Sequence, residues 1–483
     1  MKPMHVLLDP ALKKPIFQQI ADHIENQIVS GELAAGSKLP TERFLASSLR
    51  VHRTTVTKAY DELRANGFIV SKQGSGNYVR GDLWEMPGSS SWRQYIQSGA
   101  LRPTLPMMQQ LRDFSQDPHY INFADGELAE ELLPNTMLSE LLRQYPLNRW
   151  LGYSNHLGEL YLRQTLSKHL QDEYGIKAAP DQILVTSGSQ QSLHLITQSL
   201  LSYGDCVGIE GPSYFYAQPL FQSAGIRLIR LPSDEEGILP EAVSDLHKRY
   251  RLKMLILTPT YHNPTGTVLP LSRRLRLLEL SRALNIPIVE DDVYGPIRLD
   301  GAPPPPPLNV LSSADNVTLY LGSLSKTAAS GIRLGWIVGA VPVIERLADV
   351  KQQVDFGAST LLQQIADVFF TSGAWGEHLS RIRSEVTRNR DTMAEALRTY
   401  CGDDLEWNLP QGGFHFWCKV KGEVRDSELF EQAIRQQVIY VPGSLYGAEQ
   451  GHIRLSYSRV NRDEIVEGIR RLGETLRKLA KNS

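Results

Sequence analysis

Residues 317–339 read VTLYLGSLSKTAASGIRLGWIVG and decide the fold of most of the chain. Two apolar, β-rich runs enclose a polar turn, which places Lys326 just after the first run and Arg333 at the start of the second. Helical segments separate most of the other runs of this kind, an alternation that is typical of a mainly parallel α/β sheet. These other runs stand at 182–187, 205–210, 253–259 and 286–291.

The chain has 483 residues, which is more than one ordinary domain and predicts two or three. We expect a small N-terminal domain over 10–81 and an α/β body over 120–483. The residues between them, 82–119, contain MPGSSS and several prolines and are interpreted as a linker. Within the body we expect a large part over about 150–355 and a smaller α+β C-terminal part over about 356–483.

The composition is that of a soluble globular protein, with 41% hydrophobic and 22% charged residues and a net charge of −2. Basic residues gather at the N-terminal end, where residues 1–81 hold 11 Lys and Arg against 7 Asp and Glu. Three widely spaced cysteines argue against a disulfide framework or a metal site and fit a reducing compartment. Without a signal-peptide core or a long apolar run, the sequence predicts a cytoplasmic protein with no membrane segment and no metal.

The N-terminal domain shows three amphipathic helical segments followed by a short hairpin. Residues 15–30 carry isoleucines at four-residue steps, and Thr41 is a credible N-cap for a second helix, ERFLASSL. The third helix runs through HRTTVTKAYDELRANG and ends at Gly67. FIVSKQ, GSG and NYV then form strand, turn and strand, so the pattern predicts a winged helix-turn-helix.

The polar face of the third helix is suited to reading DNA, because short hydroxyls and long basic side chains at a helix start reach base edges and phosphates. The alternative is an ordinary solvated face on a three-helix bundle. The candidate DNA contacts lie on the second helix, the third helix and the wing: Arg43, His52, Arg53, Thr54, Thr55, Thr57, Lys58, Lys72, Gly74, Ser75 and Gly76.

Residues 15–79, and LPTERFLASSLRVHRTTVTKAYDELRANGFI…GSGNYV above all, closely resemble the winged helix-turn-helix of the GntR family of bacterial regulators. The sequence departs from that family at Arg50, where glycine is usual, and at His52, where serine usually caps the recognition helix. His52 is therefore either a DNA contact or a weaker helix cap.

The body carries an ordered set of residues suited to carbanion chemistry at an amino acid. Pyridoxal phosphate supports such chemistry when a protein holds it on a lysine, pairs its ring nitrogen with a carboxylate, stacks its ring and binds its phosphate. Lys326 in SLSK and Asp291 in EDDVY offer the lysine and the carboxylate. The other candidates are Tyr294 and Asn263 for the phenolic oxygen, Tyr214 for stacking, and Ser189, Gln190, Ser323 and Arg333 for the phosphate. We therefore expect pyridoxal phosphate as the cofactor.

Residues 120–483 resemble the fold-type-I pyridoxal-phosphate enzymes of the aspartate aminotransferase group. The resemblance implies that Lys326 is the Schiff-base lysine and that Tyr153 reaches the phosphate of a partner subunit. It also implies that Arg454, in HIRLSYS, binds a ligand carboxylate in a pocket that Gly126 helps to line. The alternative for Arg454 is a strand residue in a surface ion pair. After the lysine, TAASG stands where regulatory relatives usually have TLAPG.

Together the two halves resemble the MocR subfamily of bacterial regulators. This resemblance implies a domain-swapped, head-to-tail homodimer that binds double-stranded operator DNA and senses an amino acid or related amine through aldimine exchange at Lys326. The alternative is an active aminotransferase with an accessory DNA-binding domain, and a third possibility is a body that has lost its cofactor. Neither the effector nor the operator follows from the sequence.

Overall fold

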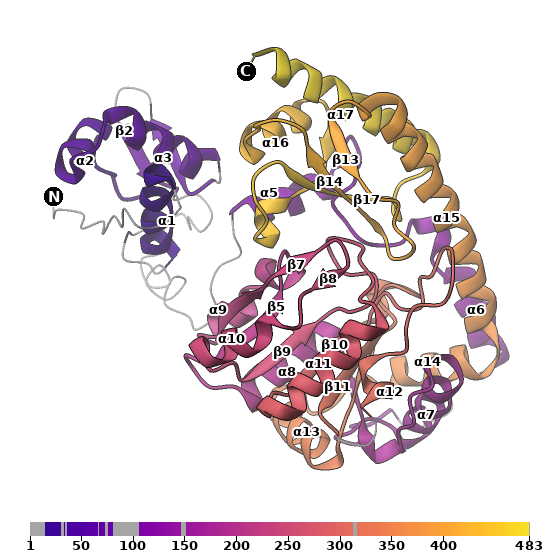
Figure 1. The fold of residues 1–483 in the computed structure, drawn as a ribbon. Coiled ribbons are helices and arrows are strands. Elements are labelled where there is room, and N and C mark those ends of the chain that lie inside the picture. The colour runs from indigo at the N-terminus through magenta and orange to yellow at the C-terminus, as the bar shows by residue number, and fades with distance from the viewer. Residues whose placement is uncertain are drawn as a thin grey trace, which may run out of the picture. The chain divides into compact units, whose positions relative to one another are not determined.

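The computed structural model describes residues 15–29, 33, 36–65, 67–72, 76–80, 106–145, 151–312 and 316–482. The chain divides into two compact units, Met1–Asp117 and Pro118–Ser483. Each unit is described separately below (Figure 1). None of the helices in the described ranges is long and apolar enough to cross a membrane.

The first unit contains the expected winged helix-turn-helix. Its helices are α1 (Ile16–Val29), α2 (Glu42–Leu49) and α3 (Arg53–Ala65), and its wing is the antiparallel pair β1 (Ile69–Lys72) and β2 (Gly76–Val79). The apolar faces of the helices and the wing form one core around Ile20, Val56 and Leu63. The predicted apolar stripes therefore face inward, as their helical spacing requires.

Arg50 occupies the position at the end of α2 where the GntR family usually has glycine. It adopts a left-handed conformation with φ 55°, and its amide bonds to the carbonyls of Ala46 and Ser47. Glycine is favoured in such a helix cap because it has no Cβ, so Arg50 holds a backbone conformation that costs a side chain some energy. The predicted cap at the other end of α2 is confirmed, since Thr41 Oγ1 accepts from the amide of Phe44 at 3.3 Å.

One further helix in this unit, α5 (Pro106–Ser115), lies within the segment that the sequence suggested as linker. Its described length gives that segment regular structure over ten residues. Residues 82–105 of the same segment lie outside the described residues.

The second unit is built on a seven-stranded sheet with the order β4-β12-β11-β10-β9-β5-β6. Every strand except β12 runs parallel, and β12 is antiparallel to both of its neighbours. The strands are β4 (Ile183–Thr186), β12 (Gly335–Val338), β11 (Thr318–Ser323), β10 (Ile288–Asp291), β9 (Met254–Leu257), β5 (Cys206–Glu210) and β6 (Arg227–Leu231). The mainly parallel sheet that the sequence predicted is confirmed.

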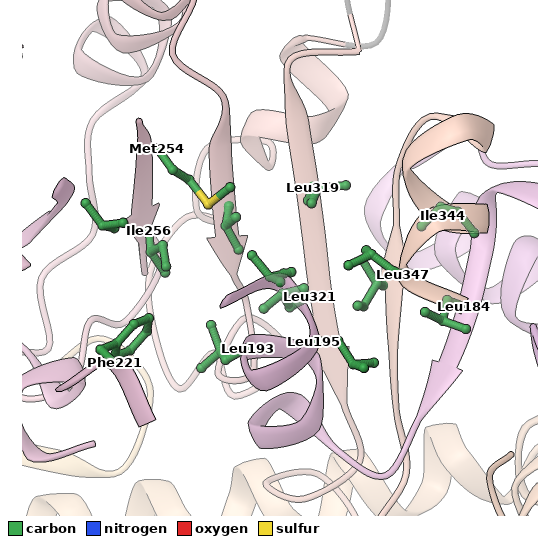
Figure 2. Close-up of a cluster of buried hydrophobic side chains, with 14 of the residues drawn as sticks. Leu184, Leu193, Leu195, Phe221, Met254, Ile256, Leu319, Leu321, Ile344 and Leu347 are labelled. Carbon is green, nitrogen blue, oxygen red and sulfur yellow. The ribbon is translucent and has the colours of Figure 1, made fainter. Parts of the chain in front are cut away.

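Two layers of helices bury the two faces of this sheet. On one face, α8 (Ser189–Leu200) and α13 (Val341–Asp355) pack against inward side chains such as Leu321 and Ile256 (Figure 2). On the other face, Leu255 and Leu257 join residues of α10 (Ala242–Tyr250), α11 (Leu271–Leu284) and α12 (Leu308–Leu311). Successive residues of β9 thus enter opposite cores, which explains why this strand is apolar throughout.

The C-terminal part is a smaller α+β layer. Its antiparallel sheet has the order β13 (Leu405–Trp407), β14 (His415–Val420), β17 (His452–Ser456) and β16 (Val441–Pro442). The long helix α15 (Ala374–Cys401) packs along α17 (Arg462–Asn482). β3 (Ile121–Asn122) pairs with β15 (Val438–Ile439), which joins the start of this unit to its C-terminal part.

The remaining elements connect these layers. They are η2 (Glu130–Leu132), α6 (Asn135–Gln144), α7 (Leu160–Tyr174), η3 (Pro180–Gln182), η4 (Tyr214–Ala217), α9 (Pro219–Ser223), β7 (Ser233–Asp234), β8 (Gly237–Ile238), η5 (Ser330–Ile332), α14 (Thr360–Thr371), α16 (Asp426–Arg435) and η6 (Gly443–Tyr446).

Candidate cofactor site and DNA-reading surface

Lys326 lies in the turn between β11 and β12. Its Nζ donates to the main-chain oxygen of Gly126 at 2.6 Å. Burial lowers the pKa of the amine to about 8; nearby Glu127 opposes this, and the positive charge of Arg454 adds to it. A lower pKa increases the fraction of neutral amine near pH 7, and the neutral amine is the form that attacks carbonyl groups.

Asp291 ends β10 and is almost completely buried, with 6% of its surface exposed. Its Oδ1 has no hydrogen-bond partner among the described residues. Burial and the adjacent Asp292 raise the pKa of the carboxyl to about 7, against the lowering effect of Lys326. Buried carboxylate oxygens are nearly always paired in proteins, so an unpaired one marks a place for a donor from outside the chain. A protonated pyridine nitrogen is a donor of this kind, and Asp291 therefore fits the expected cofactor.

Arg454 lies in β17 with 5% of its surface exposed, so the surface ion pair that we considered as an alternative is wrong. Its Nη1 donates to Asn263 Oδ1 at 3.0 Å, and its Nη2 donates to the main-chain oxygen of Ala124. Its Nε has no partner within the described ranges. The main-chain oxygen of Asn263 in turn accepts from the amide of Tyr214 at 3.1 Å. Burial and the charge of Asp291 raise the pKa of Tyr214, and the charge of Arg454 lowers it. Tyr214, Asn263, Asp291 and Arg454 therefore share one site.

Tyr294 joins this site through His415, a residue that the sequence analysis missed. The hydroxyl of Tyr294 lies 3.0 Å from His415 Nε2, and both side chains are buried. Burial, Arg454 and Lys326 lower the pKa of His415, which keeps the imidazole neutral. The available signal was a single histidine in the otherwise apolar run GGFHFW, which resembles an ordinary core histidine until the fold brings Tyr294 to it.

Gly126 is confined by the same histidine. A Cβ on Gly126 would lie 2.8 Å from His415 Cε1 and 3.4 Å from the hydroxyl of Tyr294. Its carbonyl also holds Lys326. Gly126 therefore lies next to both Lys326 and His415.

The N-terminus of α8 forms a cradle beside Arg333. Gly188, with φ 97°, is the N-cap and provides no capping side chain, so the first-turn amides of Ser189 and Gln190 remain available for an anion. Arg333 Nη2 donates to the main-chain oxygen of Ser187 at 2.9 Å and is solvent-exposed. A Cβ on Gly188 would lie 2.9 Å from that same Nη2. Glycine is thus required where the guanidinium crosses the cradle, and the arrangement fits a phosphate.

Two of the predicted phosphate ligands have partners within the chain. Ser323 Oγ bonds to Ser325 Oγ at 3.0 Å and to the main-chain oxygen of Leu334 at 3.3 Å, so it stabilises the lysine turn. The side chain of Gln190 donates to Gln218 Oε1 at 2.9 Å, which leaves its main-chain amide as the group for the phosphate.

Tyr153 stands apart from the other predicted cofactor residues in this chain. Its side chain is 87% exposed and contacts the ring of Phe356, itself 65% exposed, with centroids 5.8 Å apart. None of the interactions between described residues joins Tyr153 to Lys326 or Asp291. Within one chain, Tyr153 is therefore an exposed surface residue.

On the recognition helix, the predicted DNA contacts are mostly exposed and some are held by a neighbouring carboxylate. Glu42 of α2 accepts from Thr57 Oγ1 at 3.0 Å and from Arg53 Nη2 at 3.4 Å. His52 Nδ1 lies 2.8 Å from Thr54 Oγ1 and accepts from the Thr54 amide at 3.4 Å, so His52 does cap α3. Because His52 is also exposed, its role as a cap leaves the interpretation as a DNA contact open.

The remaining candidates lie around these. Arg43 and Lys58 are exposed and Thr55 is half-buried on the two helices. On the wing, Lys72 lies over the ring of Tyr78 at 5.1 Å, and Gly76 has φ 105°. Gly74 and Ser75 lie outside the described residues.

Comparison with known families matches two separate stretches of the chain. Residues 16–79 match the family described as bacterial regulatory proteins, gntR family. Residues 118–472 match the family described as aminotransferase class I and II.

Relatives with both parts span nearly the whole chain. The HTH-type transcriptional regulator YdfD of Bacillus subtilis, named as uncharacterized, is 37% identical over 97% of this chain and 98% of its own. The HTH-type transcriptional regulator NorG of Staphylococcus aureus is 28% identical over 92% of this chain and 100% of its own.

The similar solved structures include aminotransferases. Kynurenine aminotransferase of Pyrococcus horikoshii has a TM-score of 0.74 and 30% identity over 83% of this chain and 98% of that one. The multiple substrate aminotransferase of Thermococcus profundus has a TM-score of 0.73 and 29% identity over 78% and 96%. The first of these was solved with PMP, kynurenine as substrate and the product of that reaction.

Proposed function

This chain belongs to the MocR subfamily of GntR-type transcriptional regulators, with a body of the aminotransferase class I and II family, and on that premise we propose that an amino acid or related amine, bound at Lys326, controls its binding to operator DNA. The observation that carries the proposal is the buried, unpaired Oδ1 of Asp291, close enough to Lys326 for the amine to influence its pKa. A carboxylate and an amine in this relation have no evident structural role, and they match what pyridoxal phosphate requires.

When bound, pyridoxal phosphate supplies an aldehyde that condenses with primary amines and a ring that withdraws electrons from them. Asp291 would hold the proton on the ring nitrogen, and its burial would strengthen that pairing because few waters compete with it. Tyr214 would stack on the ring, while Asn263 and Tyr294 would donate to the phenolic oxygen. The amides of Ser189 and Gln190, together with Arg333, would bind the phosphate. The turn that Ser323 stabilises carries Lys326.

Arg454 is the proposed partner of the effector carboxylate. It is buried and carries an unpaired Nε, and its Nη1 is held by the amide oxygen of Asn263 rather than by a carboxylate. An incoming carboxylate therefore replaces a neutral acceptor with a charged one, which strengthens the interaction. Lys326 Nζ donates to the carbonyl of Gly126, so this carbonyl would hold the lysine amine while an effector amine occupied the site.

The exposed pair of Tyr153 and Phe356 supports a homodimer in which Tyr153 of one copy completes the phosphate site of the other. A domain-swapped, head-to-tail arrangement of this kind presents two recognition helices to two half-sites of the operator. The proposed regulator responds to its effector only if the effector binds the two arrangements of the dimer unequally. We place this protein in the cytoplasm, where the operator DNA is.

A second function, transamination of an amino acid, is favoured by the pKa of Lys326. An amine with a pKa of about 8 suits proton transfer near neutral pH as well as it suits effector binding. The two functions differ in turnover, because a sensor exchanges ligand without forming a keto acid.

The test follows visible absorbance and DNA binding in the same sample. Genomic fragments selected by the full-length protein serve as the DNA, and a panel of amino acids, amines and α-keto acids is added in turn. We expect one class of amine to change the absorbance of the lysine-bound cofactor and the anisotropy of labelled DNA at the same concentrations. Lys326→Ala should abolish both changes and leave DNA binding without effector intact. Sustained keto-acid formation at ordinary enzyme rates would contradict a sensing role.

A further inference from the structure

A cavity with a volume of about 450 Å³ lies in the body, and Lys326 is not among the residues that line it. It is formed by η2, the first turn of α6 and the adjoining turns of α15. Figure 1 shows α6 beside the long helix α15. Pro134, Met137 and His378 line its inner wall, and charged residues stand at its rim. The volume lies within the range of small-molecule sites.

His378 is the buried polar residue of this cavity. Its side chain is 1% exposed, and neither Nδ1 nor Nε2 has a hydrogen-bond partner in the part of the chain that the structure describes. Burial and the adjacent Arg381 lower its pKa to about 4, so the ring is neutral and offers one donor and one acceptor. Buried polar atoms without partners are rare in folded proteins, and their occurrence in a cavity wall points to a ligand that satisfies them.

Two features at one side of the cavity attract an anionic group. α6 begins at Asn135 after Pro134, which provides no capping side chain, so the positive end of a ten-residue helix faces the cavity uncapped. Arg381 follows His378 by one turn on α15 and donates to the main-chain oxygen of Glu131. No carboxylate among the described residues forms an ion pair with this guanidinium, so its charge is available for a ligand carboxylate.

The carboxylates of Glu130 and Glu131 stand at the same rim, and both residues are exposed. With two acidic groups against one guanidinium, the rim disfavours phosphate and dicarboxylates. It favours a ligand whose carboxylate is accompanied by an ammonium group. The apolar wall at Pro134 and Met137 adds room for an uncharged side chain.

We propose that this cavity is a binding site for a free α-amino acid with an apolar side chain, distinct from the site at Lys326. The carboxylate lies at Arg381 and the start of α6, and the ammonium group lies between Glu130 and Glu131. The imidazole of His378 bonds to the ligand at the inner wall.

The chain links this cavity to Lys326 over a short distance in sequence. Gly126 accepts from Lys326, and five residues later the carbonyl of Glu131 accepts from Arg381. Between these two points, the hydroxyl of Ser458 donates to the carbonyl of Glu127, and the main-chain oxygen of Ser458 accepts from the amide of Ala129. A ligand that draws Arg381 away from Glu131 therefore acts on a tethered segment whose other end positions the lysine. This link matters for regulation only under the proposed function, whereas the amino-acid site does not depend on it.

The test is calorimetric titration of L-leucine into the full-length Lys326→Ala variant, in which exchange at the lysine cannot occur. We expect saturable binding that Arg381→Gln weakens by about ten-fold or more, the loss of one charged hydrogen bond. Arg388→Gln is the matched control, because Arg388 is an exposed arginine of the same helix that pairs with Glu385 away from the cavity. Absence of leucine binding, or equal affinity in both variants, would overturn the proposal.

Two further arms test the ligand chemistry and protect against misfolding. 4-Methylpentanoate, which lacks the ammonium group, and glutamate, which carries a second carboxylate, should bind at least about ten-fold more weakly than leucine. Equal binding of either would overturn the assignment to an apolar amino acid. His378→Phe removes no hydrogen bond, so it should melt no lower than its parent, and leucine should no longer stabilise it. Retained stabilisation would remove His378 from the site. Because the lysine is absent throughout, these results are independent of whether Lys326 binds a cofactor.

Discussion

Asp291→Asn should raise the stability of the cofactor-free protein and lower its affinity for the cofactor. In the cofactor-free protein the carboxyl is buried with an unpaired oxygen, and its pKa lies at about 7. Such a group binds its proton more tightly in the folded than in the unfolded chain. The free energy of unfolding therefore falls as the pH rises from 3.8, the ordinary value, towards 7, and it stays low above that pH. Asparagine carries no charge in either state and escapes this loss.

The magnitude follows from the size of the shift. A rise in pKa from 3.8 to about 7 corresponds to about 4 kcal/mol, because one pKa unit is worth about 1.4 kcal/mol. For the unit Pro118–Ser483, the usual entropy of unfolding converts 4 kcal/mol into a rise in Tm of about 5 °C. This is an upper value, since the asparagine amide must also find partners. At pH 4 the two proteins should melt within about 1 °C of each other, because Asp291 is then protonated in the folded wild type.

Cofactor affinity should change the other way. Asparagine cannot balance the charge of a protonated ring nitrogen, and the loss of one partner from a buried ion pair costs about 3 kcal/mol or more, which is about 100-fold in affinity. The assay is the melting temperature of cofactor-free wild type and variant at pH 4 and pH 8, followed by titration with pyridoxal phosphate. Asp349→Asn is the control, because Asp349 is an exposed carboxylate paired with Arg346. Wild-type cofactor affinity in Asp291→Asn, or an unchanged Tm difference between the two pH values, would refute the reasoning.

Three further changes probe the other parts of the sites. Arg454→Gln should weaken the binding of amino acids by about 10-fold to 100-fold, which is the range for the loss of a charged hydrogen bond. The binding of simple amines should change much less, and absorbance titration would measure both affinities. Gly188→Ala should impair cofactor binding and lower the Tm, because φ is 97° and the new Cβ meets Arg333, whereas Gly331→Ala, with open space around it, should do neither. Lys58→Ala should weaken binding to all DNA sequences alike, and it should reduce by about one the number of ions released on binding. Anisotropy measured at several salt concentrations would show both effects.

The strands of the body could largely be predicted because parallel strands buried on both faces are short apolar runs. The sequence did not predict β6, which has the sequence RLIRL, because it is not a continuous apolar run. It lies at the edge of the sheet, and most of its residues are partly exposed, so arginines interrupt the apolar signal. The reversed direction of β12 also does not follow from its composition, because a run such as GWIV is equally compatible with both directions.

The candidate site was predictable where one motif supplies one group, as at Lys326 and Asp291. His415 was not, because its relevance comes from contact with Tyr294 across 121 residues of sequence and from the close approach of Gly126. Such contacts are made by the packing of the C-terminal sheet against the start of the body. The unpaired state of Asp291 Oδ1 is likewise a property of the folded interior.

The proposed phosphate cradle is hydrogen-bonded to Asp355, the residue next to the exposed aromatic pair, which bears on why the proposed site needs two copies. Gln191 accepts from the amide of Ser187 at 2.7 Å, and its side-chain amide donates to Asp355. Asp355 directly precedes Phe356, the residue on which Tyr153 rests. The loop proposed to bind phosphate and the segment that carries Phe356 are therefore linked by two side chains, Gln191 and Asp355. In the proposed dimer, a change at the phosphate site of one copy would be transmitted through Gln191 and Asp355 to the segment beside Tyr153, whose ring the same copy lends to the other. Two sites linked in this way have the physical connection that a cooperative response to effector requires.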